Sequence, residues 1–232
     1  MEPATGRLLF IETSGAAGRV GLARGGELLA DVALDQQRRH ARDLAPTVHR
    51  LLTEQGWRPG DLQAVFVSQG PGSYTGLRVG LMSAKTLCWA VGCALVPVPT
   101  LEIVALQARG LATQVEVIED AQQDRVYRQR FRFSSGDMPE PLSDLAVLEP
   151  DVWRASWSDG VMVTGPGLQR WHERLPSQVR LAPAERWLPG LAAMLTLGLR
   201  RWERQQVSDP LTLEPLYLRP SSAEEKWAAL GK

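Results

Sequence analysis

The sequence predicts an α/β protein of two similar domains, and three observations support this fold class. Short apolar runs, typical of buried strands, alternate with segments of helical periodicity. Within each half of the chain, strands come first and helices follow. The second half repeats this order more loosely, and no low-complexity linker separates the halves. At 232 residues with 44% hydrophobic content, the chain is long enough for two small domains that share a cleft.

The first half, residues 1–108, contains three predicted strands followed by alternating helices and strands. A Gly-Gly pair at 25–26 indicates a tight hairpin, because glycine tolerates positive φ. Apolar residues from Leu44 to Leu52 recur with helical spacing, and we expect Thr100 to cap the third helix. The predicted strands are 8–12, 19–23, 27–34, 64–68 and 94–98, and the predicted helices are 40–55, 75–91 and 100–108. An antiparallel meander of three strands followed by βα units is the element order of a ribonuclease-H-like domain. In such a domain the later strands are parallel to the first.

The second half, residues 109–232, is predicted to form another such domain. Its predicted strands are 115–119, 125–133, one within 142–148, 161–164 and 179–181, and its predicted helices are 151–157, 168–175 and 188–204. Each domain would then hold a mixed five-stranded sheet with helices, and the C-terminal tail has the option of returning to the first domain. Acidic and glycine-rich turns at the strand ends would meet in the cleft between the domains.

Composition limits the possible functions. Lys plus Arg equals Asp plus Glu, at 26 each, so the whole molecule is not drawn to nucleic acid by net charge. No stretch approaches eighteen uninterrupted apolar residues and no leader-like pattern opens the sequence, so we expect a cytoplasmic protein without a membrane segment. The two cysteines, Cys88 and Cys93, do not have metal-site or CxxC spacing and are expected to be small buried residues.

The first predicted strand ends in a polar turn, Glu12-Thr13-Ser14. In kinases and ATPases of this architecture, a carboxylate at this turn holds a metal-bound water, while hydroxyl and backbone N–H groups bind phosphate. Asp120 ends the first strand of the second half in the same way. The four residues are therefore candidates for a reduced phosphate-binding site. The alternative is a strand end whose hydroxyls only satisfy turn backbone.

A glycine-rich loop, GPGSYTGLRVG at residues 70–80, separates a strand from a helix. Glycines let backbone pass close to another group, and N–H groups at a helix N-terminus suit an anion or a carboxylate of a partner. Gly76 and Gly80, four residues apart, would leave a flat strip for a second helix. The simpler alternative is that Ser73 or Thr75 caps the helix and the glycines only allow a sharp turn.

These motifs resemble the TsaB family over nearly the whole chain, and the glycine-rich loop is the most specific of them. The matching segments are residues 11–14, 39–46, 70–80, 100–101, 120–121 with 126–127, and 215–219. The resemblance implies an actin/hexokinase-like fold and a non-catalytic subunit that binds and activates its catalytic paralogue TsaD. It further implies a third subunit, the ATPase TsaE, and a role in adding threonylcarbamoyl to the tRNA adenosine beside the anticodon. Contact with tRNA would be indirect, through the complex.

Two sequence features bear on the choice between TsaB and TsaD. Glu12 stands where TsaB proteins usually carry Asp, and Glu is typical of TsaD. TsaD-like proteins, however, bind a metal through a His-x-x-x-His pair on the helix after the fifth strand, and here those positions are Thr100 and Val104. The three histidines, His40, His49 and His172, are not paired at that spacing. We therefore expect no metal site, no catalytic residue and no independent activity, and no cofactor in the isolated chain; the resemblance leaves room for a nucleotide at the interface with TsaD.

The predicted partner surface consists of the helices at 40–55 and 75–91 with the glycine-rich loop. The same surface would support a homodimer in the absence of TsaD. The predicted interface residues are His40, Leu44, Val48, Gly70, Gly72, Ser73, Tyr74, Thr75, Gly76, Leu77, Arg78, Gly80, Leu81 and Ala84.

Four further points remain open in the sequence. An active ATPase or phosphotransferase would use Glu12 and Asp120 with magnesium. A metallopeptidase would need a metal pair or an activated nucleophile, and the sequence offers neither. The arginines of one strand face, Arg128, Arg130 and Arg132, would follow phosphates or pair with an acidic partner, or else form a solvated sheet face. The Gly-Pro-Gly turn at 165–167 lies where related kinases bind adenosine, although a strand-to-helix turn explains it equally well.

Overall fold

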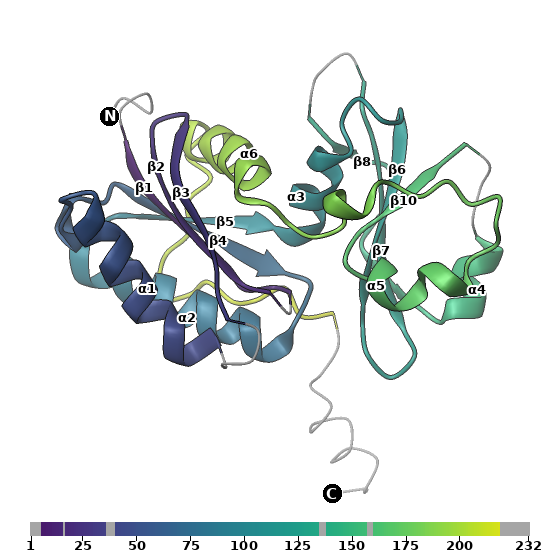
Figure 1. Cartoon of the computed structure of the whole chain (residues 1–232), viewed down its shortest axis with the longest axis horizontal. Coiled ribbons are helices and arrows are strands. Elements are labelled where there is room, and N and C mark those ends of the chain that lie inside the picture. The colour runs from purple at the N-terminus through teal and green to yellow at the C-terminus, as the bar shows by residue number, and fades with distance from the viewer. Residues whose placement is uncertain (1–5, 16, 36–39, 135–137, 157–159, 219–232) are drawn as a thin grey trace, which may run out of the picture.

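The computed structural model describes residues 6–15, 17–35, 40–134, 138–156 and 160–218, with the side chains of His40 and Ala41 outside the described part. It forms two α/β domains side by side (Figure 1). Each contains a mixed five-stranded sheet, which confirms the predicted fold class of two ribonuclease-H-like domains. Among the helices that can be described, none has the length and apolar character needed to cross a membrane.

The first sheet has the strand order β3-β2-β1-β4-β5. β1 and β4 lie at its centre because their side chains are apolar on both faces, as a strand covered by helices on both sides requires. β1 is antiparallel to β2 and parallel to β4, and β4 is parallel to β5, as predicted. The strands are β1 (Arg7–Glu12), β2 (Arg19–Arg24), β3 (Glu27–Ala33), β4 (Ala64–Gly70) and β5 (Ala94–Pro99).

Helices cover both faces of this sheet. α1 (His40–Glu54) and α2 (Tyr74–Val91) pack on one face, where they share a core with alternate residues of β1 and β4. α3 (Thr100–Gln107) contributes to the core on the opposite face and also to the core of the second domain. A short 3-10 helix, Pro59–Asp61, precedes β4. Pro99, rather than Thr100, holds the N-cap position of α3, and the Thr100 hydroxyl is buried without a hydrogen-bond partner among the described residues.

The second sheet repeats the first in a reduced form. β6 (Gln114–Asp120) is antiparallel to β7 (Val126–Arg132) and parallel to β10 (Met162–Thr164). The third strand, predicted within 142–148, is divided into β8 (Glu140–Pro141) and β9 (Ala146–Leu148), which both pair with β7. The predicted strand at 179–181 contributes a single parallel bridge, from Leu181 to Val163. The helical elements here are α4 (Pro150–Ala155), α5 (Leu168–Trp171) and the 3-10 helices His172–Arg174 and Ala184–Arg186.

The last helix, α6 (Leu191–Glu203), differs from the predicted domain assignment. We expected it to complete the second domain, but it packs on the first sheet, on the face opposite α1 and α2 (Figure 1). Trp202 meets Phe66 of β4 edge-on, with ring centroids 6.4 Å apart, and Arg201 forms an ion pair of 2.7 Å with Glu102 of α3. The helix has to lie there because its large apolar stripe matches the otherwise uncovered face of β1 and β4.

The segment after α6 also returns to the first domain. Ser208 bridges to Leu95 of β5, and the Leu216 N–H donates to the Gln69 carbonyl of β4 at 2.8 Å. Residues 208–217, which we call the strap, therefore extend along the edge of the first sheet. The first domain is built from two separate parts of the chain, and the second domain is inserted between them.

Gly198 allows the close approach of α6 to the first sheet and provides a test of it. A Cβ at this position would lie 2.1 Å from Cδ2 of Phe66. Alanine would raise helix propensity by about 0.5–1 kcal/mol, but overpacking costs about 1–3 kcal/mol. We expect Gly198→Ala to lower the free energy of unfolding by about 1 kcal/mol, measured by urea denaturation. Thr196→Ala, on the exposed side of the same helix, is the control and should not lower it; a more stable Gly198→Ala chain would contradict this packing.

Candidate functional site

The polar turn after β1 is buried and organised around Glu12. The backbone N–H and the hydroxyl of Ser14 both donate to Oε1 of Glu12, the former at 2.7 Å. The Thr13 N–H donates to Oγ of Ser68 at 3.1 Å. Oε2 of Glu12 and Oγ1 of Thr13 are buried without a hydrogen-bond partner among the described residues. Burial raises the pKa of the Glu12 carboxyl above its ordinary value, although the hydrogen bonds from Ser14 and Ser68 favour the charged form.

The glycine-rich loop closes over this turn. The Ser73 N–H donates to the Ser14 carbonyl at 2.6 Å, and a Cβ at Gly72 would lie 2.4 Å from the same oxygen. A Cβ at Gly76 would lie 2.1 Å from the Thr13 carbonyl. The Ser73 hydroxyl accepts from the Gly76 N–H at 3.2 Å and caps α2. The glycines are therefore required for contact within the chain, and the loop packs directly against the turn.

The face of α2 that was predicted to meet a partner points inward. Gly76 and Gly80 pack on Thr13; a Cβ at Gly80 would lie 2.1 Å from Oγ1 of this residue. The prediction of an exposed glycine strip is thus wrong, because the first sheet already covers it. The other predicted interface residues buried inside the chain are Leu44, Gly70, Leu77, Leu81 and Ala84. Val48, Gly72, Ser73 and Tyr74 are half-buried, Thr75 and Arg78 are exposed, and the His40 side chain lies outside the described part.

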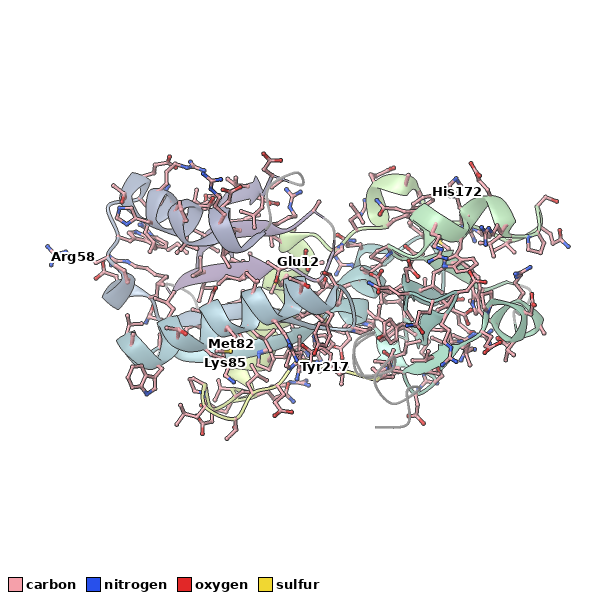
Figure 2. All side chains as sticks on the ribbon, turned by 90° about the horizontal axis from the view of Figure 1, so that it is seen from below. Glu12, Arg58, Met82, Lys85, His172 and Tyr217 are labelled. Atoms are coloured by element: carbon pink, nitrogen blue, oxygen red, sulfur yellow. The ribbon has the colours of Figure 1, made fainter. Side chains whose placement is uncertain are left out.

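The outer side of α2 carries two exposed apolar side chains. Met82 is 58% exposed and Trp89 is 70% exposed. They are seven residues apart, which places them on the same side of the helix two turns from each other. Figure 2 shows Met82 on α2 with Lys85 and Tyr217 nearby. The outer side of α2 therefore presents two large apolar groups to solvent.

The strap is fixed beside this surface by contacts that sequence reasoning missed. Tyr217 stacks on Tyr74 with ring centroids 4.8 Å apart. Arg78 lies over the Tyr74 ring at 4.1 Å and donates through Nε to the Tyr217 hydroxyl at 3.1 Å. Nζ of Lys85 donates to the Leu213 carbonyl at 2.7 Å. The segment at 215–219 and the loop at 70–80 stood out separately in the sequence, and the structure brings their described residues together.

The second domain contributes a different carboxyl from the one predicted. Glu119 is buried, its Oε1 accepts from the Asp120 N–H at 2.8 Å, and its Oε2 has no hydrogen-bond partner among the described residues. Burial raises the pKa of Glu119 to about 8, with added repulsion from Asp120 and Glu12. Glu12 lies on the side of the first domain that faces the second (Figure 2). Each domain therefore contributes one buried carboxyl, and the two are close enough for the charge of Glu12 to raise the pKa of Glu119.

Asp120, the predicted carboxylate, is engaged elsewhere. Its two carboxylate oxygens accept from Nη1 of Arg170 at 3.2 and 3.1 Å, and Oδ1 also accepts from the Gln122 N–H at 2.9 Å. Arg170 pairs in addition with Asp124 at 3.2 Å. Asp120 and Glu119 are neighbours on one strand, so they point to opposite faces. Side chains alternate along a strand, so Glu119 lies on the same face as the apolar residues Val115 and Val117. This pattern would have identified Glu119 as a second candidate.

The Gly-Pro-Gly turn after β10 is used for packing against β6. A Cβ at Gly165 would lie 2.1 Å from the Ile118 carbonyl, and the Gly167 N–H donates to that carbonyl at 3.1 Å. A Cβ at Gly167 would also lie 3.1 Å from the Glu119 backbone. The two glycines are explained by close contact between backbones, without a bound nucleotide.

The arginine stripe of β7 is largely an internal ion-pair network. Arg128 and Arg130 donate through Nε to Oε2 of the fully buried Glu116 at 3.0 and 2.6 Å. Nε1 of Trp153 donates to the other oxygen of Glu116 at 2.6 Å. The two arginines are mostly covered, whereas Arg132 is exposed and pairs with Glu140. The stripe thus holds β6, β7 and α4 together, and neither the phosphate hypothesis nor a fully solvated face describes it.

Metal-binding groups do not gather anywhere in the described residues. No cluster of three or more His, Cys, Asp or Glu side chains with metal-site geometry occurs there. His49 is exposed on α1, and Nδ1 of His172 lies 2.7 Å from the Leu168 carbonyl. The turn after β1 also fits a phosphate poorly, because the Ser14 N–H and hydroxyl, its natural donors, are both directed to Glu12.

Comparisons with known proteins agree on one family. The profile described as "TsaD: tRNA N6-adenosine threonylcarbamoyltransferase" matches residues 27–144. The chain is 28% identical to the tRNA threonylcarbamoyladenosine biosynthesis protein TsaB of Bacillus subtilis and 30% identical to that of Escherichia coli, in each case over 95% of this chain and 97% of the relative. The solved structure of YeaZ from Pseudomonas aeruginosa superposes with a TM-score of 0.78 at 27% identity, over 92% of this chain and 100% of that chain.

The protonated state of Glu119 predicts a pH dependence of stability. Its pKa of about 8 in the folded chain lies above the ordinary value of 4.5, so the folded state holds this proton more tightly than the unfolded state. The resulting stabilisation is complete below pH 4.5 and is lost as the pH rises through about 8. Glutamine stays neutral, so in Glu119→Gln we expect the free energy of unfolding to fall less steeply with rising pH. Above about pH 8 this variant should be more stable than the wild type. Asp144→Asn, at an exposed position of the same domain, should keep the wild-type slope; parallel curves for Glu119→Gln and wild type would contradict the assignment.

The Glu116 network predicts a large loss of stability when its charge is removed. Glu116→Gln keeps the size of the side chain but leaves Arg128 and Arg130 without their anion. Breaking a buried ion pair on one side costs about 3 kcal/mol or more, so the urea midpoint should fall clearly. Glu140→Gln is the matched control, because it breaks only the exposed pair with Arg132 and should leave the midpoint nearly unchanged. Equal effects of the two substitutions would show that the network does not stabilise the domain.

Proposed function

The chain belongs to the TsaB (YeaZ) family and acts in the biosynthesis of threonylcarbamoyladenosine in tRNA, and on this premise we propose that it is a non-catalytic subunit that binds and activates TsaD. Its target would be the tRNA adenosine next to the anticodon. In this proposal TsaE is the third subunit, tRNA is reached through the complex, and the assembly works in the cytoplasm.

The observation that carries this proposal is the closed turn after β1. Ser14 directs its N–H and hydroxyl to Glu12. Ser73 and Gly72 of the glycine-rich loop pack on the Ser14 carbonyl. A subunit whose own phosphate turn is filled by its own backbone is poorly suited to hold a nucleotide there. Its contribution to the reaction would then come from a surface that another polypeptide contacts, and a nucleotide would have its place at the interface with TsaD.

The outer side of α2 is the surface we assign to TsaD. Met82 and Trp89 are large, apolar and exposed, and they lie on one side of a rigid helix that is anchored through its buried face. Aromatic and methionine side chains are enriched at the centres of protein interfaces. This assignment replaces the predicted glycine strip at Gly76 and Gly80 with the opposite face of the same helix. The same apolar groups would pair two copies of the chain when TsaD is absent.

An active ATPase or phosphotransferase is the second candidate, favoured by the buried carboxyl that each domain contributes, Glu12 and Glu119. Burial raises the pKa of both Glu12 and Glu119, however, and so disfavours the ionised carboxylate that magnesium requires as a ligand. Asp120, the carboxylate required by this hypothesis, is paired with Arg170. Release of phosphate from ATP by the isolated chain, abolished in Glu12→Gln, would establish this function over the one proposed.

The proposed surface can be tested with charge substitutions on α2. Lysine is a good helix former, and at position 89 it also suits the last turn of α2, so Met82→Lys and Trp89→Lys should leave the fold intact. Loss of a central aromatic contact costs about 2–4 kcal/mol, so Trp89→Lys should weaken binding to TsaD from the same organism by at least about thirtyfold. Binding is measured by titration calorimetry, and tRNA modification is measured with both subunits present.

The matched control for this test is Val152→Lys. Val152 is 55% exposed, like Met82 and Trp89, but lies on α4 of the second domain. It should bind TsaD with wild-type affinity. Wild-type affinity of both α2 variants, in chains with unchanged circular dichroism, would exclude the outer side of α2 as the interface.

A further inference from the structure

The two cysteines of the chain meet where α2 turns into β5. Cys88 belongs to the last turn of α2, and Cys93 directly precedes β5. Gly92 between them adopts a left-handed conformation with φ of 73°, which reverses the chain at the end of the helix. This reversal brings the two sulfurs within 3.4 Å, and both thiols are free. The sequence spacing alone did not indicate this contact.

The two thiols differ in accessibility. Cys88, on the inner face of α2, is buried in the core of the first domain, whereas Cys93 packs at the edge of that core and is partly exposed. Sγ of Cys93 donates to Sγ of Cys88, and when Cys93 loses its proton the Cys88 thiol can donate in return. This hydrogen bond lowers the pKa of Cys93, and the same hydrogen bond together with burial raises the pKa of Cys88. A reagent from solvent therefore reaches one thiol, which is also the more acidic one.

We propose that Cys93 and Cys88 form a thiol modification site that reacts with small disulfides and closes to an internal disulfide. The Cys93 thiolate attacks one sulfur of a disulfide RSSR, forms a mixed disulfide with one half and releases the other half as RS⁻. Cys88 then gives up its proton and attacks the Cys93 sulfur, which releases the second RS⁻. Both leaving thiolates take up a proton, so the protein dithiol is oxidised and RSSR is reduced to two RSH. Cys93 is the attacking thiol and Cys88 the resolving thiol.

The geometry favours ring closure over a lasting adduct. A disulfide bond is about 2.05 Å long, so the sulfurs need to approach each other by only about 1.4 Å. Cys88 is held in place by the core, next to the sulfur that it must attack. A mixed disulfide at Cys93 would place the attached RS group at the edge of this packed core. Crowding there further favours release of the RS group.

The test uses the native chain with glutathione disulfide as the probe. The sequence contains only these two cysteines, so thiol titration reports on them directly. We expect both thiols to disappear, the mass to fall by that of about two hydrogen atoms, and no glutathione to remain attached. A persistent adduct with one free thiol, two unreacted thiols, or a disulfide-linked dimer would each overturn the proposal.

Single substitutions separate the two roles. Cys88→Ser should accumulate a stable glutathione adduct at Cys93, since no resolving thiol remains. Cys93→Ser should react at least about tenfold more slowly, because its remaining thiol is buried, and should react fully only in denaturant. Equal reactivity of the two variants in their native state would refute the assigned order of attack. If either variant fails to fold, the wild-type outcomes above still decide.

Discussion

The close contact between the glycines of α2 and the turn after β1 is the constraint on which the rest of the structure depends. Gly72, Gly76 and Gly80 bring backbone against Thr13 and Ser14 at distances that any side chain would prevent. This contact fixes the angle of α2 on the sheet, directs the predicted partner face into the core and leaves the opposite face outside. It also fills the space beside the turn. A glycine-rich loop that was predicted to suit an anion or a carboxylate of a partner is therefore used, in this chain, as a packing surface.

The two buried carboxyls and the outer surface of α2 consequently lie in different surroundings. Glu12 and Glu119 are buried, each has one oxygen without a hydrogen-bond partner among the described residues, and burial raises the pKa of both. On the outer side of α2, Met82 and Trp89 expose apolar area beside the strap, which Arg78 ties down. In the first arrangement the Ser14 donors are directed to Glu12 and not outward to a ligand, and the second has the composition of a protein interface. Membership of the TsaB family and the contrast between these two regions both agree with the proposed role as a non-catalytic subunit.

Sequence patterns predicted the strands and their order well, because buried central strands such as β1 and β4 are apolar throughout and the turns between them carry glycine. Helical periodicity also grouped Gly76, Leu77 and Gly80 correctly on one face. It could not tell what covers that face, since an apolar stripe looks the same whether it meets its own sheet or another protein. The place of α6 and the pairing of Asp120 with Arg170 depend on contacts between distant parts of the chain, which no local pattern encodes. Glu119 was overlooked because its more exposed neighbour fitted the expected motif.

The division of the first domain between residues 7–107 and 191–217 affects how the chain folds during synthesis. One face of the first sheet, with Phe10 and Phe66, is covered only in part, by α3, until α6 has left the ribosome, and the edge of β5 stays unpaired until the strap follows. The inserted domain is complete before either of them and can fold first, although α3, which it shares with the first domain, is already present. During translation, the first domain is therefore begun before the second domain but is completed after it. A nascent chain stalled before α6 presents an open apolar sheet, which is the kind of surface that chaperones bind.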